Sequence, residues 1–320
     1  MLKIHNLLFL MLSAVGGSVF ADEVFISLEK ADAIAVMDGG SGKLLQTIEI
    51  GKRPRDIVFS NDKKQLYVAV VEENTIKRID PTSMTVVASF QSTNPKSIAI
   101  SPDDRFLFSS NDAANQLTVI DIAKNKELKR IRIAKESEGV SVSPDGRWII
   151  STSESENLAQ WIDATTLEVI DSTQVAARPR ASKFTTDGKQ LWVTSENAGK
   201  LTVIDTVTRR PLQILSFDIP GIDSATIKPV GIRIDQKQRF AYVALGRANR
   251  VAVIDVNKLK VVDYLSVGQR VWHLEFSPDQ KRLYAANGIS GDVSVIDLEN
   301  HKVTKHVPIG LSPLSIAVKP

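Results

Sequence analysis

Short runs in which apolar and polar residues alternate fill the chain from residue 24 to its end. In the stretch PKSIAISPDDRFLFSSNDAANQLTVIDIAKNKELKRIRI, β-branched and aromatic residues alternate with polar ones in four such runs. A period of two is typical of β-strands with one buried face, so we expect strands at 98–100, 106–109, 117–120 and 127–133. Ser-Pro-Asp follows the first run and an aspartate ends the third, and both are common turn formers.

The same pattern recurs along the chain at a nearly constant spacing. One marker is a hydrophobic run that ends in aspartate, at Asp38, Asp80, Asp121, Asp163, Asp205, Asp255 and Asp297. The successive spacings are 42, 41, 42, 42, 50 and 42 residues. A second marker, typified by SPD, keeps step at 59–62, 100–103, 142–145, 184–187 and 276–279, with a degenerate copy at 234–237. A period of this length containing four short strands is typical of a β-propeller blade.

The two chain ends supply the two parts of one further blade. The C-terminal SPLSIAVKP matches a first strand alone, and residues 22–51 match the second to fourth strands. Pairing between the chain ends would close the ring and leave no open sheet edge. We therefore predict an all-β fold, a single seven-bladed β-propeller domain over 22–320 with four antiparallel strands per blade. One blade is composite, formed by 22–51 and 312–320.

One spacing is longer than the others because of extra residues around FDIPGIDSATIKP, 217–229. We place this insertion in the loop that joins the fourth and fifth blades. Lengthening a surface loop costs little free energy, whereas long loops in compact folds are often functional. The sequence does not decide between a tolerated insertion and a functional loop.

The N-terminal segment differs from the repeats. It has a short polar start with Lys3, an apolar run over 7–19, and small residues at Val19 and Ala21. This pattern predicts a secretory signal peptide over 1–21 that is cleaved after Ala21. The alternative is a retained membrane anchor, for which the apolar run is short and rich in glycine. Export of a chain without eukaryotic features predicts a periplasmic location.

Composition narrows the possible chemistry. The chain has no cysteine, which excludes disulfides, a lipidated cysteine, cysteine-ligated metal and covalently attached c-type haem. The apolar and charged fractions, 43% and 24%, are those of an ordinary globular protein. The net charge is +3, or +2 once Lys3 is removed with the signal peptide. This balance argues against general nucleic-acid binding.

Several units resemble a known repeat family. QLYVAVVEENTIKRID, LWVTSENAGKLTVIDTVT and LYAANGISGDVSVIDLEN resemble the YVTN family of β-propeller repeats, over essentially all of residues 24–320. ARPRASKFTTDGKQLWVTSE and DYLSVGQRVWHLEFSPD are similar to the propellers associated with PQQ-dependent catabolism. The narrower resemblance implies a functional link to PQQ and to periplasmic proteins of a PQQ-dependent alcohol dehydrogenase system. It implies no catalytic residues and no bound cofactor.

The first strand of each blade is expected to line the central channel, with its start at one mouth. The seven starts are RPRD 53–56, NPKS 94–97, ESEG 136–139, RPRA 178–181, KPVG 228–231, RVWH 270–273 and SPLS 312–315. Residues two apart in an extended chain project to the same side. Arg53 with Arg55, Arg178 with Arg180, and Arg270 with Trp272 should therefore point together, and Lys96 and Lys228 add charge.

Such a basic collar would bind a small anion or an acidic protein partner. The guanidinium fork matches carboxylate and phosphate oxygens, and Trp272 can stack on a planar ligand or on an arginine. The alternative is that the arginines merely pair with acids such as Glu136, Glu138 and Asp56. The predicted ligand- or partner-binding residues are Arg53, Arg55, Lys96, Arg178, Arg180, Arg270, Trp272 and His273.

Two neighbouring features have simpler interpretations. The loops between second and third strands, at 72–74, 111–115, 153–157 and 195–197, are mostly acidic and form either a rim around the collar or ordinary polar turns. His273 directly follows Trp272, so in a regular strand it faces the other way. A histidine without a ligand partner nearby is more often structural than metal-binding or catalytic.

We weigh three functions. The first is a non-catalytic periplasmic binding or scaffold propeller associated with PQQ-dependent alcohol oxidation, which holds an anionic ligand or protein partner at the collar. The alternative is a propeller enzyme, either a lactonase or a quinoprotein-type oxidoreductase. PQQ alcohol dehydrogenases have eight blades and a vicinal cysteine pair, which this chain lacks. Nucleic-acid binding through the same arginines is the least favoured. No catalytic or metal-binding residue is predicted.

Overall fold

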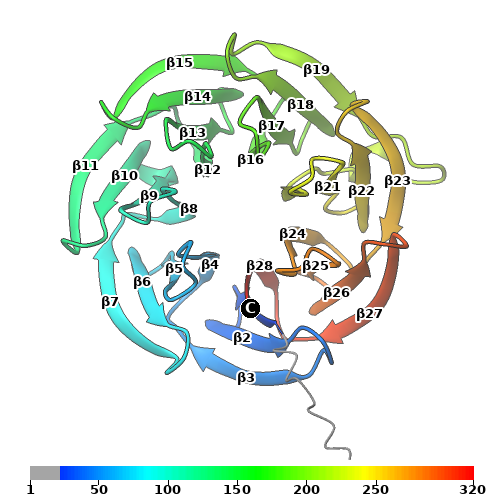
Figure 1. Cartoon of the computed structure of the whole chain (residues 1–320), viewed down its shortest axis with the longest axis horizontal. Coiled ribbons are helices and arrows are strands. Elements are labelled where there is room, and N and C mark those ends of the chain that lie inside the picture. Colours follow the sequence, from blue (N-terminus) through cyan, green and yellow to red (C-terminus); the bar gives the residue numbers. More distant parts are fainter. Residues whose placement is uncertain (1–21) are drawn as a thin grey trace, which may run out of the picture.

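The computed structural model describes residues 22–320, and the predicted signal peptide over 1–21 lies outside the described residues. Seven four-stranded sheets stand around a central axis, and every pair of neighbouring strands within a sheet is antiparallel (Figure 1). The predicted seven-bladed β-propeller is therefore confirmed. None of the helices within 22–320 has the length and hydrophobicity needed to cross a membrane.

Each blade has an inner strand at the channel and an outer strand at the periphery. The inner strands are β4 (Pro54–Phe59), β8 (Pro95–Ile100), β12 (Ser137–Val142), β16 (Pro179–Phe184), β20 (Ile232–Ile234), β24 (Val271–Phe276) and β28 (Pro313–Lys319). The second strands are β5 (Leu66–Val70), β9 (Phe106–Asn111), β13 (Trp148–Ser153), β17 (Gln190–Ser195), β21 (Phe240–Ala244), β25 (Arg282–Asn287) and β1 (Glu23–Leu28).

The remaining strands complete the blades in the same order. The third strands are β6 (Thr75–Asp80), β10 (Gln116–Asp121), β14 (Leu158–Asp163), β18 (Lys200–Asp205), β22 (Arg250–Asp255), β26 (Asp292–Asp297) and β2 (Ala33–Asp38). The outer strands are β7 (Thr85–Gln91), β11 (Lys126–Arg132), β15 (Glu168–Gln174), β19 (Pro211–Ser216), β23 (Lys260–Ser266), β27 (Lys302–Pro308) and β3 (Leu44–Glu49). We number the blades from 1, which begins at β4, to 6, and call the composite blade 7.

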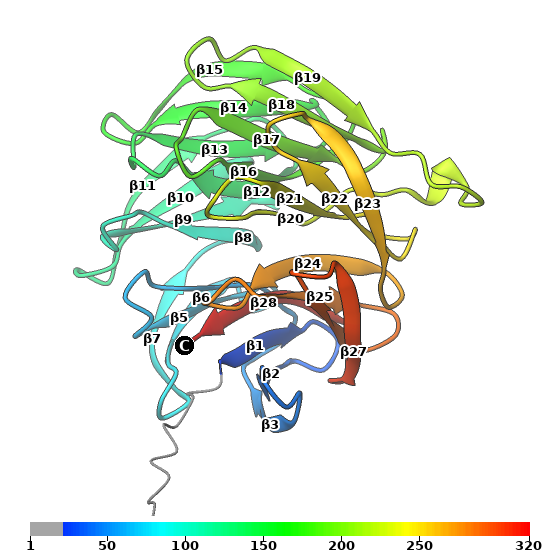
Figure 2. The ribbon, with the colours of Figure 1, turned by 45° about the vertical axis from the view of Figure 1, so that its right-hand side comes forward.

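The two chain ends close the ring within blade 7. The C-terminal strand β28 pairs antiparallel with β1, with Ile316 opposite Ile26 and Ala317 opposite Phe25. Figure 2 shows β28 lying beside β1. The inner strand of this blade therefore comes from one end of the chain and its other three strands from the other end. This is the predicted closure, and it leaves blade 7 with no missing strand.

The SPD marker encodes one turn that recurs between first and second strands. The Ser101 hydroxyl donates to the Asp103 carboxylate at 2.6 Å and accepts the backbone N–H of Phe106 at 2.9 Å. The corresponding hydroxyl–carboxylate pairs, at 2.5–2.7 Å, are Ser60–Asp62, Ser143–Asp145, Thr185–Asp187 and Ser277–Asp279. In the degenerate fifth blade, the Asp235 carboxylate accepts the backbone N–H of Arg239 at 2.7 Å.

These turns predict loss of stability in acid. The hydrogen bond from Ser101 lowers the pKa of Asp103. Backbone hydrogen bonds from Thr166 and Thr165 lower the pKa of Asp163, which lies at the turn between the third and fourth strands of blade 3. Because the folded pKa lies below the unfolded value, these groups stabilise the fold above about pH 4 and lose that contribution as the pH falls further. The urea midpoint of tryptophan fluorescence should fall between pH 7 and pH 3. An unchanged midpoint would contradict this prediction.

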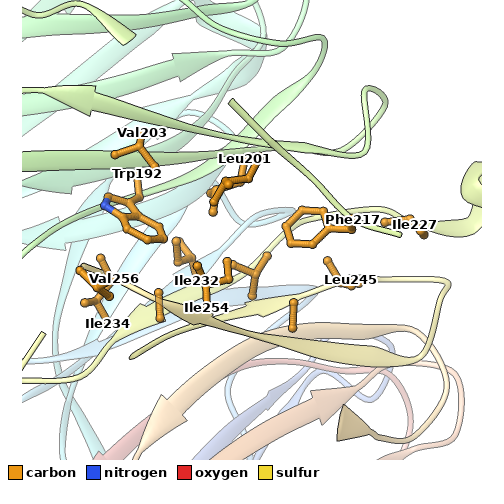
Figure 3. Close-up of a cluster of buried hydrophobic side chains, with 14 of the residues drawn as sticks. Trp192, Leu201, Val203, Phe217, Ile227, Ile232, Ile234, Leu245, Ile254 and Val256 are labelled. Atoms are coloured by element: carbon orange, nitrogen blue, oxygen red, sulfur yellow. The ribbon is translucent and has the colours of Figure 1, made fainter. Parts of the chain in front are cut away.

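The core lies between adjacent blades. In the cluster of Figure 3, Trp192 and Leu201 of blade 4 pack against Ile232 and Ile254 of blade 5. The insertion over 217–229 joins β19 to β20, as predicted, and contains the 3₁₀ helix η2 (Ser224–Thr226). A second 3₁₀ helix, η1 (Asp112–Ala114), lies between β9 and β10. The buried side chains that the insertion adds to this cluster are Phe217, Ile219 and Ile227. The insertion therefore covers the seam between blades 4 and 5.

Candidate functional site

A cavity of about 630 Å³ follows the propeller axis and is lined by residues from all seven blades. Its lining includes Asn61, Pro102, Pro144 and Thr186, which are exposed and lie in the turns between first and second strands. The cavity therefore reaches solvent at that side of the ring, which we call the turn face. The opposite side, where the inner strands begin, is the collar face.

At the collar face, ion pairs extend across the channel. Arg55 of blade 1 donates to Glu138 of blade 3 at 2.7 Å, and Arg270 of blade 6 lies 3.4 Å from Glu196 of blade 4. Each pair joins blades that are not neighbours in the ring, so the side chains must cross part of the channel. Arg55 and Glu138 are only 13% and 14% exposed. Side chains therefore fill much of this mouth.

Arg180 lies at the centre of this network. It is 11% exposed, and it contacts Glu138 at 3.1 Å, Glu196 at 3.6 Å and Glu154. Burial alone would raise the pKa of Glu138, but the charges of Arg55 and Arg180 lower that pKa to about 2. Glu154 and Glu196 belong to the acidic loops between second and third strands, and they turn inward onto the arginines. Most of the collar charge is thus neutralised by glutamates.

The collar residues do not all share the predicted orientation. Arg178 and Arg180 meet, because both contact Glu154 and Glu196. Arg53 and Arg55 do not, since Arg53 pairs with Glu29 at 3.1 Å and is 41% exposed. The left-handed φ of 60° at Arg53 does not explain this difference, because Arg178 has the same φ and still shares its glutamates with Arg180. The position of the acidic partner decides the direction instead, since Arg53 reaches Glu29 of blade 7 and Arg55 reaches Glu138 of blade 3. The prediction that these two side chains point together is therefore wrong.

The other predicted collar residues are also engaged. The Arg270 guanidinium lies 4.3 Å from the centroid of the Trp272 ring, and the Arg180 guanidinium lies 5.8 Å from it. Lys96 pairs with Asp112 at 3.5 Å. Of the acids named as alternative partners, Glu138 is used, whereas Asp56 instead accepts hydrogen bonds from Ser97 and Ser315. The role of these residues in binding a ligand or partner stays a prediction.

His273 faces the channel, which corrects the expectation from simple alternation. Both Trp272 and His273 line the cavity, because the register of β24 against β25 shifts between Val271 and Leu274. Such a β-bulge re-aims the side chains that follow it. The same shift occurs at the start of the inner strands of blades 1 to 4.

Hydrogen bonding determines which tautomer the neutral His273 ring adopts. Its Nδ1 accepts the backbone N–H of Ile316 at 3.1 Å, so the proton of the neutral ring lies on Nε2. Burial and then the charge of Arg233 lower the pKa of His273 to about 4, which keeps the ring neutral at pH 7. Nε2 lies 3.0 Å from Nη2 of Arg233, which is also a donor. Two donors that face each other at this distance cannot hydrogen-bond to one another, so an acceptor that both N–H groups reach, such as a carbonyl or anionic oxygen, would be stabilised beside them.

Arg233 and Lys183 occupy the adjoining blades. Glu275 holds Arg233 through hydrogen bonds of 3.0 Å from Nε and 2.9 Å from Nη2. Lys183 also lines the cavity, but no ion pair within residues 22–320 involves it. The channel walls, and then the charge of Arg233, lower the pKa of Lys183 to about 8, although its side chain is exposed to solvent in the cavity. A lysine of this kind can act as a base near neutral pH.

The sequence interpretation missed Lys183, Arg233 and Glu275. They stand at one register position of the inner strands, where blades 1 and 2 have Val58 and Ala99. The available signal was a charged residue in the middle of an inner strand, next to apolar residues, as in IRI of β20 and LEF of β24. This signal is weaker than the cluster of arginines at the strand starts, which drew the prediction to the collar.

Two protein families match parts of the chain. Residues 61–183 match the family described as Cytochrome D1 heme domain, and residues 162–307 match the family described as Lactonase, 7-bladed beta-propeller. Each match spans less than half of the chain. No curated protein sequence matches the chain significantly.

Solved structures share the architecture at low identity. The periplasmic gluconolactonase PpgL of Pseudomonas aeruginosa is 19% identical, with a TM-score of 0.77 over 93% of this chain and 99% of its own. A functionally unknown protein of Desulfotomaculum acetoxidans is 18% identical, with a TM-score of 0.78 over 92% of this chain and 98% of its own. The dihydro-heme d1 dehydrogenase NirN is 17% identical, with a TM-score of 0.69 over 92% and 74%. By its fold, this chain is a β-propeller protein.

Proposed function

We propose that this protein is a propeller enzyme that hydrolyses a small cyclic ester inside the axial cavity. The observation that carries the proposal is that neighbouring inner strands place three groups along one wall of the cavity. These are Lys183, which has no ion-pair partner within residues 22–320, and the two donors of His273 and Arg233. The partial matches to a lactonase family and the likeness to a gluconolactonase support it. These likenesses favour the interpretation as an enzyme over the interpretation as a non-catalytic scaffold.

The reaction follows from these three side chains. The neutral amine of Lys183 takes a proton from water as the water oxygen bonds to the ester carbonyl carbon. The Nε2–H of His273 and the Arg233 guanidinium stabilise the carbonyl oxygen as it becomes negative. The ring C–O bond then breaks, and the Lys183 ammonium returns its proton to the leaving alkoxide. The product is a hydroxy acid.

This function is compatible with the context that the sequence resemblance implies. Oxidation of a diol through its cyclic hemiacetal yields a lactone, so a lactone hydrolase consumes a product of alcohol oxidation. The signal-peptide pattern supports a periplasmic location for both steps. A link to PQQ-dependent alcohol dehydrogenases therefore does not require direct binding of PQQ.

The channel residues do not fit a haem-type cofactor of the kind that the NirN likeness suggests. His273 is the histidine that lines the cavity, but its Nδ1 is bonded to Ile316 and its Nε2 faces the Arg233 guanidinium at 3.0 Å. A cation beside the ring nitrogen disfavours coordination of iron. We derive no step through such a group.

A second candidate is non-catalytic binding of a small anion, and Lys183 favours it. The other cations that line the cavity, Arg55, Lys96, Arg180 and Arg233, each have an acidic partner. An anion would therefore bind at Lys183 inside the cavity rather than at the collar. Bound anion without turnover of any lactone would favour this candidate.

The test measures acid release from a panel of γ- and δ-lactones by titration. The His273→Leu variant removes one oxyanion donor and should lower kcat about 100-fold. His273→Gln keeps an N–H donor and should lose less. His306→Leu, at a site 51% exposed on the outer strand β27, is the matched control. Absence of turnover by the unaltered protein across the panel would reject the proposed function.

A further inference from the structure

Below the collar, the cavity has two chemically different walls. At one register position of the inner strands, blades 4 and 5 carry Lys183 and Arg233, whereas blades 1 and 2 carry Val58 and Ala99. The apolar wall continues through Ile100 and Val142 of blades 2 and 3. Figure 1 shows that blades 1 to 3 lie across the channel from blades 5 and 6. A ligand at the basic wall therefore faces an apolar wall.

The apolar side chains keep part of their surface open to the cavity. Val58, Ala99, Ile100 and Val142 are all half-buried, although they lie on the innermost strands. The exposed part of these side chains faces the channel, because all four line the cavity. Water against this surface is unfavourable, and an apolar ligand group that displaces it is favoured.

The polar groups on the same side are already engaged. The Ser97 hydroxyl donates to Asp56 at 2.9 Å, and the Ser141 and Ser182 hydroxyls share a hydrogen bond of 2.6 Å. A polyhydroxylated ligand placed against Val58 and Ile100 would lose hydrogen bonds to water without replacement, which is costly. The wall is therefore suited to carbon chains and rings rather than to hydroxyl groups.

We infer that the substrate is a lactone that carries an alkyl or aryl group, in contrast to a sugar lactone. The inference rests on the proposed function and names its substrate class. The ester carbonyl binds at His273 and Arg233, and the apolar group binds against Val58, Ala99, Ile100 and Val142. These four residues determine specificity.

The test uses lactams, whose ring amide resists hydrolysis, so binding is measured apart from turnover. Calorimetry compares a plain δ-lactam, the same ring with alkyl chains of increasing length, and a polyhydroxylated δ-lactam. Each added methylene should tighten binding about fourfold until the wall is covered. The polyhydroxylated ring should bind most weakly.

The Val58→Thr variant adds a hydroxyl with little change in shape, and it should weaken binding of the alkyl lactams but not of the plain ring. Val86→Thr makes the same change on the outer strand β7, where Val86 is exposed, and should have no effect. Equal or tighter binding of the polyhydroxylated lactam, or an unaffected Val58→Thr variant, would overturn the inference. If alkyl lactams bind as expected but no lactone is hydrolysed, the apolar specificity stands and the proposed function fails.

Discussion

Replacing Lys183 by methionine is expected to lower kcat for lactone hydrolysis at least about 100-fold, because it removes the proposed general base. Methionine keeps the length of the side chain and removes a charge that has no ion-pair partner within residues 22–320, so the fold should persist. The measurement is acid release at saturating lactone, with circular dichroism and thermal melting to verify the fold.

The pH dependence gives an independent readout of the same residue. Only the neutral amine can accept a proton, so kcat of the unaltered protein should rise as the pH increases through the pKa of Lys183, which is about 8. The residual activity of Lys183→Met should lack this rise. Lys189→Met removes a lysine that is 80% exposed at the turn face and should keep both the rate and the profile. A Lys183→Met variant with unaltered kcat would remove this residue from the mechanism.

Replacing Arg180 by methionine is expected to lower the free energy of unfolding by about 3 kcal/mol or more. Arg180 is buried against Glu138, Glu154 and Glu196, and its loss leaves buried carboxylates short of their counter-charge. Urea denaturation followed by tryptophan fluorescence measures the change. Arg180→Lys keeps the charge without the planar fork, so its free energy of unfolding should lie between those of the unaltered protein and Arg180→Met.

Arg53→Met is the matched control for this experiment. Arg53 also pairs with a glutamate, but the pair lies at the surface and exposed pairs contribute only about 0–1 kcal/mol. Comparing the stability losses of the two variants therefore distinguishes the contribution of the buried ion-pair network from that of a surface ion pair. Equal losses of stability for Arg180→Met and Arg53→Met would show that the pairs across the channel do not hold the collar together.

These expectations divide the channel into two parts with different roles. At the collar face, arginines and glutamates form ion pairs, and the pairs Arg55–Glu138 and Arg270–Glu196 link blades that are not neighbours. Deeper in the cavity, Lys183 has no ion-pair partner in the described part of the chain, and the donors of His273 and Arg233 lie 3.0 Å apart. Substrate would therefore reach the site from the turn face, where the cavity contacts exposed turn residues.

The repeat architecture was predictable from the sequence because its causes are local. A strand alternates apolar and polar residues, and the turn after it needs a hydroxyl and a carboxylate two residues apart, as Ser101 and Asp103 show. The spacing of these markers defines the blades. The incomplete copies at the two ends predict the pairing of β28 with β1, since an unpaired inner strand would leave an open edge.

The arrangement of the channel depended on tertiary structure. The sequence indicated which residues stand at the starts of the inner strands, but it did not show that Arg55 meets Glu138 from a blade two positions away. It also placed His273 on the wrong side, because alternation holds only in a regular strand and β24 contains a bulge after Val271. Lys183, Arg233 and His273 are far apart in the chain and converge only because three inner strands stand side by side. The sequence by itself determined the blades, their turns and the closure of the ring, which depend on local periodicity. Which side chains meet across the axis was decided only by the closed ring and its bulged strands.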